Sequence, residues 1–68
     1  MEMREYLDTL VEQIRFKKAR ELVEEEVKSH IEDQMEAYRA QGMTEAEAEE
    51  RAVRQMGDPV EAGVALDR

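Results

Sequence analysis

The sequence predicts an all-α fold: a small three-helix bundle with a short fourth helix at the C-terminal end. Apolar residues recur at steps of three and four along most of the chain, which is the spacing of one helix face. Glycine, threonine, aspartate and the single proline stand where helices end and begin. The remaining connections are only a few residues long, which favours antiparallel packing of neighbouring helices.

Length and composition limit the possibilities further. Residues 1–68 are expected to form one domain, near the lower size limit for a chain that folds without disulfides or metal. With 10 basic and 18 acidic residues, the net charge of −8 repels nucleic acid and anionic lipid, so we expect no nucleic-acid partner. No apolar run approaches the roughly 20 residues that span a bilayer, and no signal peptide is visible. We therefore expect a soluble intracellular piece of a longer protein that does not itself insert into the membrane.

Two apolar stripes predict the first two helices. The first stripe is Met3, Tyr6, Leu7, Leu10, Val11 and Ile14. The second is Val23, Val27, Ile31, Met35 and Tyr38. Their centres differ by roughly 130° at about 100° per residue, so one straight helix would point its two apolar faces in different directions. We therefore place a turn at Arg15–Lys18, although this segment has no glycine or proline.

The stretch QGMTEAEAEERAVRQMGDP, residues 41–59, predicts a capped helical corner. Gly42 has the position of a left-handed residue that ends the second helix. Thr44 and Glu47 match a capping box at the start of a third helix, expected over Glu45–Met56. Gly57 is expected to end that third helix in the same left-handed conformation.

A fourth, short helix is predicted directly after this corner. Asp58 is placed to cap it, and Pro59 stands at its first position. The helix carries Val60, Val64 and Leu66, and we expect it to fray at Asp67 and Arg68.

No catalytic, cofactor or metal site is expected. Glu26, His30 and Asp33 could approach one cation, but ligands from a single helix rarely hold a metal, so we expect His30 to pack its ring and bond a carboxylate. Paired carboxylates need a cleft that separates their pKa values, and a domain of this size has little room for one. One histidine and no cysteine exclude the common nucleophile–base pairs, and the isolated glycines form no phosphate loop.

The basic segment Arg15–Arg20 has two interpretations. It could contact an anionic surface such as the cytoplasmic leaflet. It could equally be an ordinary turn with long solvated side chains, which four cations in a chain of net charge −8 favour.

The chain resembles the permease prefix domain and the related HAAS signalling domains. The residues that carry the resemblance are EEEVKSHIED, then GMTEAEAEERAVRQMGDP, then the short apolar helix. The glycine, the alanine- and glutamate-rich helix and the MGDP corner are the diagnostic part, and YLDTLVEQI fits the opening of the family. The resemblance covers essentially the whole chain, and its motifs are structural and not catalytic.

The resemblance implies a cytoplasmic domain at the N-terminus of a bacterial membrane protein, tethered to the inner face of the cell membrane. Two attached modules are implied: a permease-like transporter subunit, or a cell-division and cell-shape protein of the FtsW/RodA/SpoVE group. The opening YLDTLVEQIRFKKAR is most similar to the second group. The alternative is a stand-alone HAAS-type signalling domain that works with a PadR-type transcriptional regulator.

A protein partner is expected, either the protein's own membrane module or a second copy of the domain. The expected contact surface comprises Leu22 and the final helix around Val64 and Leu66. Acidic side chains at Glu25 and Glu49 would favour a basic partner. The alternative for Leu22 is that it packs against the first helix.

Overall fold

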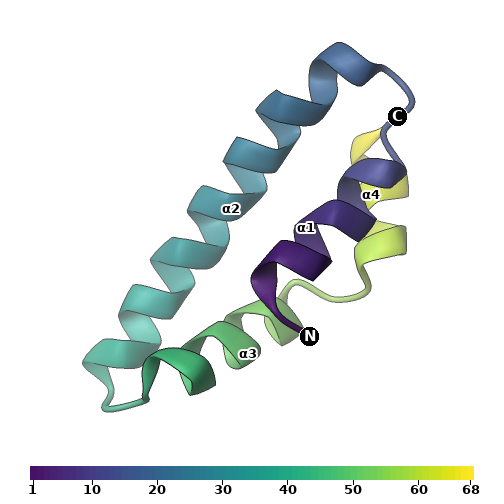
Figure 1. Cartoon of the computed structure of the whole chain (residues 1–68). Coiled ribbons are helices and arrows are strands. Elements are labelled where there is room, and N and C mark those ends of the chain that lie inside the picture. The colour runs from purple at the N-terminus through teal and green to yellow at the C-terminus, as the bar shows by residue number, and fades with distance from the viewer.

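The computed structural model describes all residues, 1–68, and contains four α-helices and no strand. These are α1 (Met3–Glu12), α2 (Lys17–Ala40), α3 (Glu45–Gln55) and α4 (Pro59–Leu66). The long helix α2 sets the elongated shape, with principal extents of 39 × 18 × 16 Å (Figure 1). The predicted class, an all-α bundle with a short fourth helix, is confirmed.

Helix α1 lies at the centre of the arrangement. It contacts each of the other helices, with α2 on one side and α4 on the other (Figure 1). Helix α3 turns back and packs along the C-terminal half of α2 (Figure 1). Helix α4 runs in the same direction as α1, because Gly63 lies against Leu10 and Asp67 bonds to Arg15.

The core is thin and almost entirely aliphatic, because only one of the three aromatic residues is buried. Its buried members are Tyr6, Leu7, Leu10, Ile14, Val27, Ile31, Ala48, Ala52 and Val53. The two stripes that predicted the first helices supply most of this set, and the alanines let α3 approach closely. Burying these side chains is the main driving force for folding.

The break between the first two helices is real but lies two residues earlier than predicted. The non-helical residues are 13–16, and α2 begins at Lys17 after an extended Phe16 that provides no side-chain cap. Instead, the Arg20 side chain reaches back and its Nε donates to the Ile14 carbonyl at 2.7 Å. The turn is therefore fixed by contacts beyond its own residues, which explains its weak local signal.

Candidate interaction surfaces

The glycine corners have the predicted backbone conformation. Gly42 has φ 100° and Gly57 has φ 84°, and no other residue has a positive φ. A side chain at either position would meet no atom within 4 Å. The requirement for glycine is therefore conformational and does not come from crowding.

The predicted caps are also present. Thr44 Oγ1 accepts from the Glu47 N–H at 3.2 Å, and Glu47 Oε1 accepts from the Thr44 N–H at 3.0 Å. The Thr44 N–H is the main reason that the pKa of Glu47 lies below its usual range. Asp58 Oδ1 accepts from two backbone N–H groups of α4, and Pro59 is the first residue of that helix. The corner thus has a structural role in aiming α3 and α4.

Gly63 is the residue on which α4 rests, and the sequence did not identify it. A Cβ atom there would overlap the carbonyl oxygen of Leu10 and lie 2.7 Å from Gln13 Cβ. Only glycine allows the two backbones to come this close. The small residues on either side of Gly63 in α4, Ala62 and Ala65, were the available signal in the sequence.

The larger side chains of α4 point away from the molecule. Val60, Val64 and Leu66 are 44%, 47% and 51% exposed, while Gly63 is the only fully buried residue of the helix. Val64 and Leu66 thus lie at the surface, as expected for part of this helix. A helix that rests on glycine leaves its branched side chains for solvent or for a partner.

Leu22 does not pack against the first helix. Its side chain is 62% exposed, so that alternative interpretation is wrong. Leu22 belongs to α2, and α2 and α4 pack on different sides of α1 (Figure 1). Its use as a contact residue stays a prediction.

The two acidic residues expected to favour a basic partner, Glu25 and Glu49, differ in their surroundings. Glu25 is exposed and its carboxylate forms no hydrogen bond or ion pair with the rest of the chain. Glu49 is half-buried, and its Oε2 accepts from the Met3 N–H at 3.0 Å. Glu49 therefore joins the start of α1 to α3 in addition to any role at a surface.

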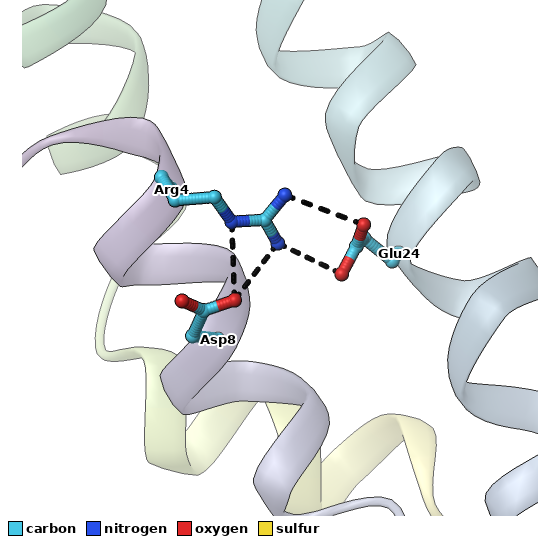
Figure 2. A network of polar contacts seen from close by, with 3 residues as sticks. All are labelled: Arg4, Asp8 and Glu24. Carbon is cyan, nitrogen blue, oxygen red and sulfur yellow. Dashed lines mark hydrogen bonds and ion pairs between the residues drawn. The ribbon is translucent and has the colours of Figure 1, made fainter.

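An arginine joins α1 to α2 at the surface (Figure 2). Arg4 Nη2 lies 2.9 Å from Asp8 Oδ1 and 2.8 Å from Glu24 Oε1. The hydrogen bonds that the Arg4 guanidinium donates to Glu24 are the main cause that raises the pKa of Arg4. All three groups are partly or largely exposed, so we expect the network to contribute only modest stability.

The basic segment is largely occupied by intramolecular contacts. The Arg15 backbone N–H and Nε donate to the two carboxylate oxygens of Asp67 at 2.8 and 2.6 Å. These bonds, the backbone one first, hold the pKa of Asp67 below its usual range. With Arg20 bonded to Ile14, two of the four cations fix the turn, which favours the structural interpretation. Helix α4 ends at Leu66, so Asp67 and Arg68 lie outside it as predicted, but the Asp67 side chain is held in place by Arg15.

His30 is also not where we expected it. It is exposed and its ring forms no hydrogen bond, because it falls on the flank of α2 that no other helix covers. Neither His30 with Glu26 and Asp33 nor any other group of three such side chains has an arrangement that could hold a metal ion.

Tyr6 is the one buried side chain with a titratable group. Burial, with a smaller contribution from the Asp58 charge, raises the pKa of its phenol. The hydroxyl has no hydrogen-bond partner within the protein. A neutral phenol fits a core position better than a proton-transfer role at neutral pH.

None of the helices combines the length and apolar character that a bilayer crossing requires. Comparisons of the chain with protein-family models, curated proteins and solved structures found no match.

Proposed function

We propose that the chain is a non-catalytic protein-interaction domain of a bacterial membrane protein, held at the cytoplasmic face of the membrane. The observation that carries the proposal is the outward orientation of Val60, Val64 and Leu66 on α4. In a chain with 41% charged residues, one short helix presents mainly apolar side chains to solvent. Such surfaces are typical of protein contact sites.

The resemblance to the permease prefix domain supports the cellular context. Its diagnostic positions in this chain are structural, since Gly42, Thr44 and Glu47 shape one corner and Gly57 and Asp58 shape the next. The attached module would be a cell-division or cell-shape protein of the FtsW/RodA/SpoVE group, or a permease. The partner would then be cytoplasmic loops of the same protein.

A second candidate follows from the HAAS relatives. In that case the domain would signal to a PadR-type transcriptional regulator through the same apolar helix. The coding sequence after residue 68 separates the two: runs of roughly 20 apolar residues support the membrane protein. Their absence, together with a neighbouring regulator gene, would support the second candidate.

Cross-linking in cells tests the contact surface itself. A photoreactive residue is placed in the full-length protein at Val64, Leu66 or Leu22, with the exposed Ser29 as control. We expect cross-links to the protein's own membrane module from the α4 positions and none from position 29. Equal products from all positions, or none from α4, would contradict the proposed surface.

A further inference from the structure

A groove at the α2–α3 end of the molecule has an apolar floor and an acidic rim. It has a volume of about 460 Å³ and lies between the start of α1, the C-terminal half of α2 and the first turns of α3. Its lining residues are Met3, Glu32, Met35, Glu36, Arg39, Glu45 and Glu49. The hydrogen bond from the Met3 N–H to Glu49 joins α1 to α3 beside the groove.

The floor is formed by two methionines. Met3 and Met35 are half-buried, and each packs against the core and also lines the groove. Methionine is flexible and polarisable, so a methionine floor accepts apolar side chains of different shapes. The floor therefore favours an inserted apolar side chain over a rigid small ligand.

The charge of the rim is not neutralised within the protein. Four carboxylates line the groove against the single cation Arg39, and Arg39 forms no ion pair. Three other arginines, Arg4, Arg15 and Arg54, do pair with carboxylates elsewhere. The uncompensated rim charge attracts cations within a Debye length of about 8 Å. No three of the carboxylates could hold a metal ion, so cationic side chains spread along the rim fit better.

We propose that this groove binds a basic amphipathic segment of a protein partner. An apolar side chain of the segment would contact Met3 and Met35, and its lysines or arginines would reach Glu32, Glu36 and Glu45. This inference rests on the proposed role as a protein-interaction domain and names the chemistry of its partner.

A second copy of the chain fits the groove poorly. Each copy carries a net charge of −8, and the only basic cluster has Arg15 and Arg20 held by Asp67 and Ile14. A lysine- or arginine-rich segment of another protein has the complementary charge without this repulsion.

A designed peptide provides the test. The probe is an 18-residue helical peptide of leucine and lysine with the leucines on one face, titrated onto the isotope-labelled 68-residue chain at physiological salt. We expect amide shifts around Met3, Met35 and Glu45, and binding weakened at least tenfold by Glu32→Gln with Glu36→Gln. The control is Glu21→Gln with Glu26→Gln, which removes the same charge from exposed positions of the same helix outside the groove and should change the affinity less than twofold.

Three outcomes would overturn the inference. The first is that the control pair weakens binding as much as the Glu32→Gln and Glu36→Gln pair does. The second is that a peptide whose leucines are scattered around the helix binds as tightly as the probe. The third is that the amide shifts are centred on α4. Dimers in sedimentation that the Glu32→Gln and Glu36→Gln pair abolishes would identify a second copy as the occupant instead. Met35→Ala, which leaves the charge unchanged, should weaken the probe several-fold if the floor takes part.

The groove and the proposed function can fail separately. If the probe fails the groove test while α4 still cross-links to the membrane module, only the groove assignment is lost. If the probe binds as expected and α4 gives no cross-links, the groove stands and the α4 surface is wrong.

Discussion

Gly63 decides how α4 sits, because the backbone of α4 touches the Leu10 carbonyl at this residue. We expect Gly63→Ala to destabilise the domain by about 1–3 kcal/mol, since the added methyl group must push α4 away from α1. Ala65→Val is the control: it enlarges an exposed residue of the same helix and should stay within about 0.5 kcal/mol. Urea unfolding measures both. Equal stability of the two variants would mean that the helices are not in such close contact.

The corner glycines act by a different mechanism. Valine at Gly42 or Gly57 should cost more than about 1 kcal/mol, because a β-branched residue is strained at positive φ. A Cβ atom at either position would contact no other atom, so a loss of stability would come from backbone strain alone. Ala40→Val, at the last helical residue before Gly42, measures the loss of stability from introducing a valine where φ is negative. Thermal melts that superimpose on the wild type would show that the two helices end elsewhere.

Among the helices, the N-terminal cap of α3 makes a contribution to stability that can be measured. Thr44→Ala removes the oxygen that accepts from the Glu47 N–H, and we expect a loss of about 0.5–2 kcal/mol. Thr44→Ser keeps the acceptor and should restore most of the stability. A Thr44→Ala variant as stable as the wild type would show that the capping box contributes nothing.

The carboxylates at helix ends predict a dependence on acid. Folding lowers the pKa of Glu47 and of Asp67, so their contribution is present above the ordinary carboxyl range of about 4 and is lost as pH falls through the lowered values. We expect the free energy of unfolding to fall below about pH 4.5. Asp67→Asn should reduce that slope, while Asp33→Asn, an exposed residue without partners, should not. Identical slopes for all three proteins would contradict the role of the Arg15–Asp67 bond.

A helix end could be predicted from the sequence when the residues that fix it are close together in the chain. The caps at Thr44 and Asp58 and the glycine corners rest on residues a few positions apart, so the sequence predicts them correctly. The start of α2 depends on Arg20 reaching Ile14, and the anchoring of Asp67 depends on Arg15. No local sequence pattern reveals either contact.

The candidate surfaces follow the same division. Exposure of Val64 and Leu66 could be expected for part of a short helix at the edge of a small core. The groove could not, because Met3, Met35 and Glu45 come from three helices and Met35 reads in sequence as part of the core stripe. His30 was misplaced because helical spacing shows the flank on which a residue falls but not whether a neighbouring helix covers it.

In the molecule as a whole, we expect the apolar side chains of α4 to bind a partner and not to support the core. The direct measurement combines stability and cross-linking for the full-length protein carrying Val64→Glu and Leu66→Glu. Ser29→Glu with Ala37→Glu adds the same charge to exposed positions of α2 and serves as the control. We expect both pairs to keep the helical circular dichroism signal and to lose no more than about 1 kcal/mol of stability, because all four side chains are exposed. We further expect that only the α4 pair loses its cross-links to the partner. Unfolding of the α4 pair, or cross-links that survive in a folded α4 pair, would contradict this role of α4.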